Sequence, residues 1–397
     1  LLTGLLLWLL SPVAYRHGLL DRPKGRKDHA YPTPIIGGLA IAVAVFATLF
    51  ALNDYSEMLG AFAAASTLLI VVGHLDDTYD LRWWWRMMSH VAAALIMVYW
   101  GGVRVDYVGP IFTDTPLVLG PWAVPFTVVA TVGLINAVNM CDGADGLAGS
   151  LCLVALVMLA AAALYAGNQP LVMSLLPIIA AVAVFLAFNM RFPWQRRAKV
   201  FLGNAGSAFL GFTIAWAAFR LTQNTAHPVS SALAPWLLAP PVIDCLVLIV
   251  RRVKLGRSPF CADRDHIHHL LLDAGFKPTQ VALGLAMVSL LLGSLAALVL
   301  QTNVGNETHL VVGFGLLTLA YYRLTSQRSR AVRVFRQWKG AFEGPAPLVY
   351  RGRGRRSSRP QARPVRETKA RASVDDVAKV AARLAEPVVI QRAAEKG

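Results

Sequence analysis

Two adjacent carboxylates, Asp76 and Asp77, follow a long apolar run over residues 59–72. Such a run usually ends at Lys, Arg, Trp or Tyr, since a carboxylate near hydrocarbon must be solvated or bound to a cation. Carboxylate oxygens suit Mg²⁺, which can in turn hold a diphosphate. We therefore predict a divalent-metal site in a loop over residues 73–81, with one carboxylate on the metal and its neighbour facing a second partner. A solvated acidic loop is the plainer alternative.

Asn or Asp recurs every third residue in a second polar stretch, at Asn136, Asn139, Asp142 and Asp145. At helical or 3₁₀ spacing these four side chains would line one face. Helix capping would explain one or two of them, but not four in register. Because apolar runs adjoin the stretch on both sides, we expect it to contact a ligand rather than solvent alone.

Three histidines, His266, His268 and His269, come shortly after Arg257 in a long basic connector. A zinc site is a competing interpretation, but the sequence offers no cysteine pair or second cluster to complete it. Imidazole and guanidinium groups that contact phosphate or sugar oxygens fit better. Asp244 lies within an apolar run, and we expect it to face this connector or the arginines that follow it.

Two further connectors carry weaker signals. Lys24, Arg26 and Lys27 form a basic loop that can hold an anionic lipid phosphate at a membrane interface. A Gly-x-x-Gly-Ser turn over residues 203–207 contains Asn204 and can present backbone N–H groups to a phosphate. Basic loops also set membrane topology and small residues also serve helix packing, so neither signal is specific by itself.

The elements that must position these residues are membrane helices. Of the 397 residues, 56% are hydrophobic and 15% are charged, which predicts an all-α polytopic integral membrane protein rather than a soluble domain. By length and apolarity we expect about eleven transmembrane helices. They lie around residues 1–20, 35–52, 59–75, 84–101, 121–138, 147–166, 171–189, 203–221, 232–250, 279–300 and 309–325.

Basic connectors alternate along the chain with connectors nearly free of Lys and Arg. By the positive-inside rule the N-terminus is then periplasmic, the C-terminus is cytoplasmic, and the polar connectors share the cytoplasmic face. We predict a transmembrane domain over residues 1–325. Residues 326–397 are rich in Arg, and we predict a disordered basic tail that contacts anionic inner-leaflet lipids and no nucleic acid.

Acidic metal ligands, an Arg and His phosphate clamp and a membrane-embedded body together require a diphosphate substrate and a partner in the bilayer. Phosphoryl transfer from a nucleotide diphosphate to a lipid phosphate meets both needs. On these motifs the chain resembles the polyprenyl-phosphate N-acetylhexosamine-1-phosphate transferases. The matching stretches are residues 21–29 with Gly37-Gly38, Asp76-Asp77-x-x-Asp80, residues 136–146, residues 201–207, residues 257–260 and residues 266–269.

The resemblance implies a role for each matching residue. Asp76, Asp77, Asp142 and Asp145 would be catalytic and, with Asn204, would hold Mg²⁺ or Mn²⁺. The substrate-binding residues would be Asn136, Asn139, Arg257, His266, His268 and His269 for the nucleotide-sugar, and Lys24, Arg26 and Lys27 for the lipid phosphate. Related enzymes are often dimers, so a homodimer is a further expectation.

The resemblance also implies a reaction. GlcNAc-1-phosphate would pass from UDP-N-acetylglucosamine to undecaprenyl phosphate at the bacterial inner membrane, with release of UMP. This step would initiate a surface polysaccharide of the O-antigen or enterobacterial common antigen type. The muramoyl-pentapeptide branch typically carries a third consecutive His, where this chain has Leu270. Another UDP-N-acetylhexosamine would use much the same motifs.

One residue departs from the family pattern, and two other classes deserve comparison. Many members have Asp where this chain has Asn204, and an uncharged amide should weaken metal affinity. Membrane prenyltransferases of the UbiA type also use Asp-rich motifs, but have no counterpart of the Asn-x-x-Asn-x-x-Asp-Gly or His-Ile-His-His stretches. A transporter would carry charged residues near the bilayer midplane and internal repeats.

Overall fold

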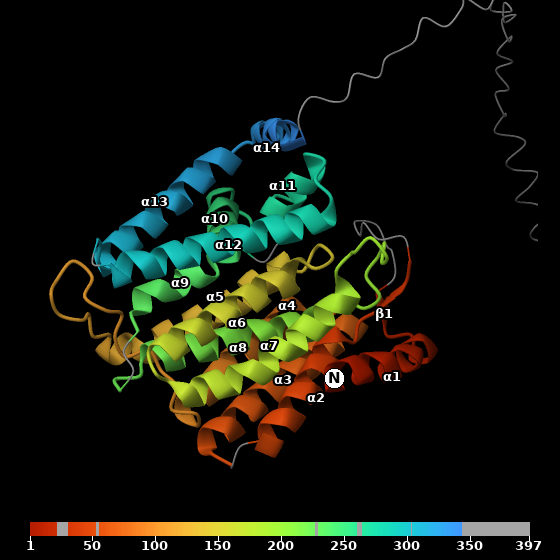
Figure 1. Ribbon diagram of the computed structural model, residues 1–397, viewed down its shortest axis with the longest axis horizontal. Helices are drawn as coiled ribbons and strands as arrows, with labels where there is room; N and C mark the ends of the chain where they lie inside the picture. Colours follow the sequence, from red (N-terminus) through yellow and green to blue (C-terminus); the bar gives the residue numbers. More distant parts are fainter. Residues whose placement is uncertain (22–30, 53–54, 227–228, 260–263, 303, 344–397) are drawn as a thin grey trace, which may run out of the picture. The chain divides into compact units, whose positions relative to one another are not determined.

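The computed structural model describes residues 1–21, 31–52, 55–226, 229–259, 264–302 and 304–343. They form one helical unit, shown in Figure 1, and so confirm the all-α class. The helices are α1 (Leu2–His17), α2 (Gly37–Leu52), α3 (Glu57–Tyr79), α4 (Trp83–Tyr99), α5 (Ala123–Cys141), α6 (Leu147–Tyr165), α7 (Gln169–Asn189), α8 (Gly203–Thr222), α9 (Ala234–Leu237), α10 (Ala239–Lys254), α11 (Ile267–Asp273), α12 (Pro278–Gln301), α13 (Glu307–Thr325) and α14 (Arg328–Glu343). Two 3₁₀ turns, η1 (Gly120–Trp122) and η2 (Ser231–Leu233), precede α5 and α9.

A short ribbon lies beside the start of α8. Strand β1 (Leu20–Asp21) pairs antiparallel with β2 (Thr33–Pro34), with Leu20 opposite Pro34. The backbone N–H of Phe201 donates to the Pro34 carbonyl at 2.8 Å, and that of Gly37 donates to the Phe201 carbonyl at 3.0 Å. These bonds tie the first connector to the segment that leads into α8.

Helix α8 is the centre of the bundle. Every residue from Ala205 to Phe219 is buried, as expected for a helix that is apolar on all sides. It packs against α2, α3, α5 and α6. Its first turn carries Asn204, so the polar groups at this end are held in place by several neighbouring helices.

The acidic stretch is helical, which corrects the predicted loop. Helix α3 continues through Asp76 and Asp77 to Tyr79. It ends where Asp80 adopts a left-handed conformation with φ 52° and donates its N–H to the Asp76 carbonyl at 2.9 Å. The Thr78 hydroxyl also bonds back to the His74 carbonyl at 2.9 Å. The apolar surface of α3 stops at these polar side chains. The helix itself continues, because Asp and Thr can adopt helical backbone angles.

The predicted helix over residues 232–250 is wrong as a single straight span. Helices α9 and α10 are bent by 87° with respect to each other, with the break at Leu238. Pro240 and Pro241 occupy the first turn of α10, and proline can neither donate a helical hydrogen bond nor tolerate a preceding helical turn. Each of the other ten predicted ranges contains a helix, namely α1 to α8, α12 and α13.

Five segments in the described part of the chain are long and apolar enough to cross a membrane. They are Glu57–Tyr79, Gly120–Cys141, Leu147–Tyr165, Gln169–Asn189 and Pro278–Gln301, and the bent pair α9 and α10 would add a sixth. This supports a multi-pass membrane protein. The expected eleven crossings and the orientation of the termini stay predictions.

The first part of the predicted disordered tail is folded. Residues 328–343 form α14, which packs against α11 and α13. Ala331 and Phe335 are buried one helical turn apart, and this apolar stripe is what lets a basic helix pack. Residues 344–397 lie outside the described residues.

Candidate active site

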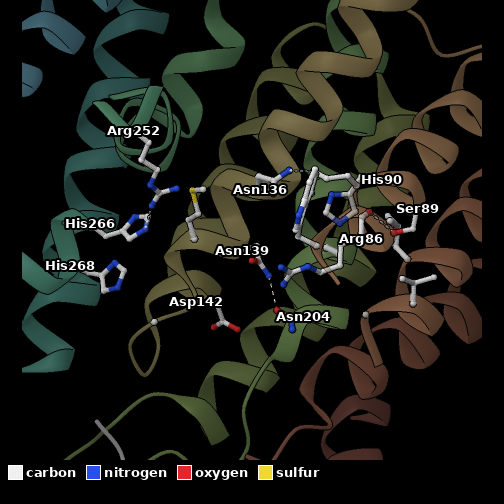
Figure 2. Close-up of a pocket in the computed structure, with 18 of the residues that line it drawn as sticks. Arg86, Ser89, His90, Asn136, Asn139, Asp142, Asn204, Arg252, His266 and His268 are labelled. Atoms are coloured by element: carbon white, nitrogen blue, oxygen red, sulfur yellow. Dashed lines mark hydrogen bonds between the residues drawn. The ribbon is translucent and has the colours of Figure 1, made fainter. Parts of the chain in front are cut away.

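A cavity of about 300 Å³ lies where α3, α4, α5, α8, α10 and α11 meet. Its polar side chains come from two facing sides and from the space between them. Figure 2 shows Arg252, His266 and His268 on one side, Arg86, Ser89 and His90 on the opposite side, and Asn139, Asp142 and Asn204 between them. Charged and polar groups from α4, α8, α10, α11 and the end of α5 therefore converge on one space within an apolar bundle.

One set of side chains, Asp76, Arg86 and Asn204, forms what we call the carboxylate cluster. Asp76 Oδ2 accepts hydrogen bonds from Asn204 Nδ2 at 2.7 Å and from the Arg86 guanidinium at 3.2 Å. Asp76 Oδ1 is buried and has no hydrogen-bond partner among the described residues. Asn204 Oδ1 in turn accepts from Asn139 Nδ2 at 2.9 Å. The cluster thus links α3, α4, α5 and α8, with Arg86 and Asn204 facing the cavity and Asp76 behind them.

Asp77 also contacts the first turn of α8, but through the backbone of Asn204 and not through its side chain. Its carboxylate accepts from the backbone N–H of Asn204 at 3.0 Å and of Ala205 at 3.5 Å. A negative charge is favoured at a helix N-terminus. Asp77 also lines a second, smaller cavity together with His74 and Thr78. The two adjacent carboxylates therefore bond to different groups of the same first turn. The expectation that one of them binds a metal and the other a second partner stays a prediction.

Three of the four regularly spaced residues reach the main cavity. Asn136, Asn139 and Asp142 line it. The prediction that Asp145 shares their face is wrong, since its carboxylate pairs with Arg191 Nε at 2.6 Å. Helix α5 ends at Cys141, and the backbone leaves the helical region at Asp142, with ψ 41°. Asp145 therefore no longer follows the helical repeat and contacts Arg191 instead.

The second set, Asp244, Arg252 and His266, forms what we call the histidine cluster. His266 Nδ1 lies 2.8 Å from Asp244 Oδ2, and His266 Nε2 lies 3.5 Å from the Arg252 guanidinium. The carboxylate favours a proton on Nδ1, which leaves Nε2 as an acceptor toward Arg252. Arg252 also donates to the Pro259 carbonyl at 2.6 Å. Asp244 thus faces the histidine connector, one of the two arrangements expected from the sequence.

His268 lies deepest on the histidine side and is 1% exposed. Neither of its ring nitrogens has a hydrogen-bond partner in the part of the chain that the structure describes. Burial lowers the pKa of the His268 imidazole well below its usual range, as do the nearby charges of His269 and His266. A Cβ atom on Gly143 would lie 2.4 Å from His268 Nε2, so the loop after α5 contacts this ring directly.

The same loop places Asp142 in the cavity between the two sides. Desolvation in this partly buried position raises the pKa of the Asp142 carboxyl well above its usual range, and the charges of Asp77 and Asp145 raise it further. A cation at this position would relieve both effects.

Carboxylate oxygens at and beside the cavity could hold a divalent cation. Asp76 Oδ1 is a buried acceptor without a hydrogen-bond partner among the described residues, and Asp142 adds a carboxylate at the cavity. Such oxygen donors fit Mg²⁺ chemically. Among the described residues, however, no group of three His, Cys, Asp or Glu side chains converges as a ready-made metal site. A metal that takes only one or two protein carboxylates and completes its shell from substrate phosphates and water fits this arrangement.

Of the remaining predicted residues, His269 lies at the cavity, Arg257 lies away from it, and three lie outside the described residues. Arg257 is exposed, and its backbone N–H donates to the Arg252 carbonyl at 2.8 Å. His269 lines the cavity with its neighbours. Lys24, Arg26 and Lys27 lie outside the described residues.

The sequence prediction missed three ionisable cavity residues, Arg86, His90 and Arg252. Arg86 and His90 are one helical turn apart in α4, so they share a face of an apolar helix. Ionisable residues inside an apolar run are functional candidates by default, and this signal could have identified the pair. Arg252 has the weaker signal of an Arg next to the basic connector.

The chain is similar to known proteins over most of its length. The family described as Glycosyl transferase family 4 matches residues 59–222. A protein of Escherichia coli strain K12 is 33% identical over 321 residues, which cover 81% of this chain and 87% of the relative. Proteins of Yersinia pestis and Haemophilus influenzae are 31% and 32% identical, covering 84% of this chain and 91% and 94% of their own lengths. All three are named undecaprenyl-phosphate alpha-N-acetylglucosaminyl 1-phosphate transferase.

The chain belongs to glycosyl transferase family 4. This confirms the resemblance to the polyprenyl-phosphate N-acetylhexosamine-1-phosphate transferases and favours it over the prenyltransferase alternative. The family match runs from α3 to the end of α8 and so contains the whole carboxylate cluster. In this transferase the histidine cluster comes from helices that follow the matched region.

Proposed function

We propose that the chain transfers GlcNAc-1-phosphate from UDP-N-acetylglucosamine to undecaprenyl phosphate and releases UMP. The observation that carries the proposal is the cavity between the carboxylate and histidine clusters, in a chain whose relatives are named for this acceptor and sugar. An oxygen of the lipid phosphate would attack the phosphorus that bears the sugar. The bond from that phosphorus to the UMP oxygen would break, and a new diphosphate would join sugar and lipid.

The chain's own residues would bind and orient the two phosphates. Arg86 and Arg252 bring fixed positive charges to the cavity from opposite sides, and each is held by a named partner, Asp76 or His266. Planar guanidinium groups held in this way recognise phosphate oxygens well. The neutral ring of His268, buried and without a partner in the described structure, would bind a sugar or phosphate oxygen through an N–H.

We also propose that Mg²⁺ is the cofactor, with Mn²⁺ as a substitute, held by Asp76 and Asp142. When bound, the ion would draw together phosphate oxygens and neutralise the charge that develops on them. Asn204 holds Asp76 from the other side through its amide N–H. Asp77, which faces the first turn of α8, would act from the second cavity, on the side of the lipid phosphate.

Release of UMP tests the proposed function directly. Purified protein in detergent is given undecaprenyl phosphate, Mg²⁺ and one UDP-sugar at a time, either UDP-N-acetylglucosamine or UDP-N-acetylgalactosamine. We expect UMP release that needs both lipid and metal and is faster with the glucosamine donor. A faster reaction with another donor would reassign the sugar. Absence of release with every donor, from protein that elutes as a single folded species, would refute the transferase proposal.

We further propose that the cavity opens to the cytoplasm, with the N-terminus periplasmic, in the bacterial inner membrane. The arginine-rich connector between α7 and α8 leads directly into Asn204, so the basic end of the bundle is also the cavity end. The positive-inside rule then supports a cytoplasmic cavity, and anionic lipid would meet the arginines after residue 350. A membrane-impermeant thiol reagent on whole cells should label Thr115→Cys and spare Arg196→Cys, in a Cys261→Ser background. The reverse pattern would invert the topology.

A further inference from the structure

The histidine side of the cavity rests on a very short helix. Helix α11 has seven residues, and an isolated helix of that length is not stable in water. Its histidines nevertheless need a fixed position to recognise a phosphate or sugar. The contacts that hold α11 therefore decide how well this side of the cavity is formed.

The N-terminal end of α11 is held by α10 and α13. Asp244 accepts from the backbone N–H of Ile267 at 3.1 Å and from His266 Nδ1 at 2.8 Å. The Tyr321 hydroxyl of α13 donates to the same carboxylate. This carboxylate at the first turn fixes one end of the helix.

The C-terminal end is held by α14, which lies beside α11 in Figure 1. The Arg328 guanidinium donates to Asp265 Oδ1 at 3.0 Å, to the Arg264 carbonyl and to Asp273 Oδ2. A second arginine, Arg336, lies about two turns further along α14 and donates to the Asp273 carbonyl at 3.3 Å. One guanidinium thus bonds to the chain both before and after the histidines, while it does not line the cavity itself.

An apolar contact covers the back of α11. Leu270 and Ala274, one turn apart, pack with Ala331 and Phe335 of α14, and all four are at most 3% exposed. His268 faces the cavity instead. Helix α11 therefore has one face toward the cavity and another face that packs on α14.

We propose that α14 is a brace for the donor-binding histidines and that Arg328 is its positioning residue. The proposal rests on the proposed function in one respect, since it takes the histidine side to bind the UDP-sugar. Arg328 acts through α11 and touches no substrate. Its loss should leave the carboxylate cluster intact, because that cluster is built on α3, α4 and α8. The defect should therefore appear in binding of the nucleotide-sugar and not of the lipid.

The test compares Arg328→Ala with Arg330→Ala, which removes an exposed arginine of the same helix. Two readouts are taken on the full-length protein in detergent. The first is the rate at which diethyl pyrocarbonate modifies His268, followed by peptide mass spectrometry. The second is KM for UDP-N-acetylglucosamine and, separately, KM for undecaprenyl phosphate. The labelling readout needs no turnover, so it still reports on the brace if the proposed reaction is wrong.

We expect Arg328→Ala to speed His268 labelling several-fold and to raise KM for the UDP-sugar about tenfold, as small misplacements of binding groups do. KM for the lipid should stay within about twofold, and Arg330→Ala should match the wild type in every readout. Unchanged His268 labelling in Arg328→Ala would overturn the brace. Faster labelling with an unchanged KM for the UDP-sugar would overturn the positioning role.

A second pair of variants covers the case in which Arg328→Ala does not fold. Arg328→Lys keeps the charge but cannot span both flanks of the histidine segment, and Asp273→Asn removes one partner. Each should reproduce part of the effect, and the double variant should be no worse than the more defective single variant, since both remove one interaction. Strictly additive effects of the two changes would contradict the contact between them.

Discussion

The two sides of the cavity are built in different ways. The carboxylate cluster sits near the ends of long helices, and its hydrogen bonds join α3 and α4 to the first turn of α8, the helix at the centre of the bundle. The histidine cluster sits beside a helix of seven residues, which side chains from α10, α13 and α14 hold at its two ends. Each side presents an arginine to the cavity, Arg86 on the first and Arg252 on the second, and Asp142 lies between them (Figure 2).

The two sides should therefore respond differently to the loss of a single side chain. On the carboxylate side the backbone is fixed by helix packing, so replacing one side chain should change the chemistry and leave the geometry in place. On the histidine side the geometry itself depends on a few ion pairs and hydrogen bonds. Changes there should alter substrate binding first. The predictions below test this contrast, beginning with the largest expected effect.

Asp76→Asn should cause the largest loss. It removes the charge that faces both Arg86 and Asn204, in a site where we propose that fixed charges stabilise the transferring phosphate. We expect kcat for UMP release to fall by about 10³-fold, as loss of one preorganised electrostatic group does in other enzymes. The protein should still elute as a folded species, because the amide can keep one hydrogen bond to its neighbours.

The matched control for this change is Asp106→Asn, which neutralises an exposed carboxylate paired with the exposed Arg104. We expect its kcat to stay within about twofold of wild type, since exposed ion pairs contribute little. If Asp76→Asn retained more than a tenth of the wild-type rate, the carboxylate cluster would not be the chemical side of the cavity.

Arg86→Ala should have the next largest effect, about 10²-fold in kcat/KM, because a charge-assisted contact to a phosphate is lost. It also leaves Asp76 with Asn204 as its remaining side-chain donor among the described residues. Arg86→Lys should recover part of the rate, since lysine restores the charge but not the planar fork. Steady-state UMP release with each substrate varied in turn measures both. Equal rates for Arg86→Ala and wild type would place Arg86 outside the reaction.

Helix packing under the carboxylate cluster can be tested at Gly73. A Cβ atom there would lie 2.5 Å from Ala205 Cα, so Gly73→Ala must push α3 away from α8. We expect a loss of about 1–3 kcal/mol in the free energy of unfolding, typical of overpacking. A thermal unfolding scan in detergent detects it as a lower transition temperature.

The control is Gly133→Ala, at a glycine of α5 with open space around its Cα. Alanine there should leave the protein equally stable or more stable by up to about 1 kcal/mol, since it favours the helix. If the two variants unfolded at the same temperature, close packing of α3 on α8 would not be what fixes Asp76 next to Asn204.

Much of this architecture follows from the sequence because hydrophobic length and polar spacing are local signals. Helices appear at the predicted ranges, and Asn139, Asp142, His266 and His268 reach the cavity as their motifs indicate. Prediction from local sequence patterns is less accurate where the backbone changes direction. It extends the Asn and Asp repeat to Asp145, although the chain leaves the helix three residues earlier. It also reads 232–250 as straight despite two adjacent prolines.

Other features depend on partners far along the chain. Arg86 lies in an ordinary apolar helix, and only the fold brings it to Asp76. Helix α14 lies in a basic sequence after the membrane segments. The sequence alone does not show what its apolar stripe packs against, because the partner is α11. The sequence shows which residues can do chemistry, whereas tertiary contacts decide which of them work together.

The smallest predicted effect concerns the residue that departs from the family pattern. Asn204 Nδ2 donates to Asp76 Oδ2 at 2.7 Å, so Asn204→Asp would bring two carboxylates into contact. Their repulsion is relieved when a cation binds between them. We expect the Mg²⁺ concentration for half-maximal activity to fall about tenfold, because a neutral ligand becomes a charged one. Without Mg²⁺ the variant should unfold at a lower temperature than wild type, and added Mg²⁺ should stabilise it more.

The control for this last change is Asn204→Ala, which removes the amide and adds no charge. It should lose activity without any gain in Mg²⁺ affinity, and its unfolding temperature should respond to Mg²⁺ no more than that of the wild type does. If Asn204→Asp left both the activity profile and the Mg²⁺-dependent unfolding unchanged, Asn204 would not be a metal ligand. Its amide would then serve to hold Asp76 and Asn139 together across α8, which is the role its two hydrogen bonds already show.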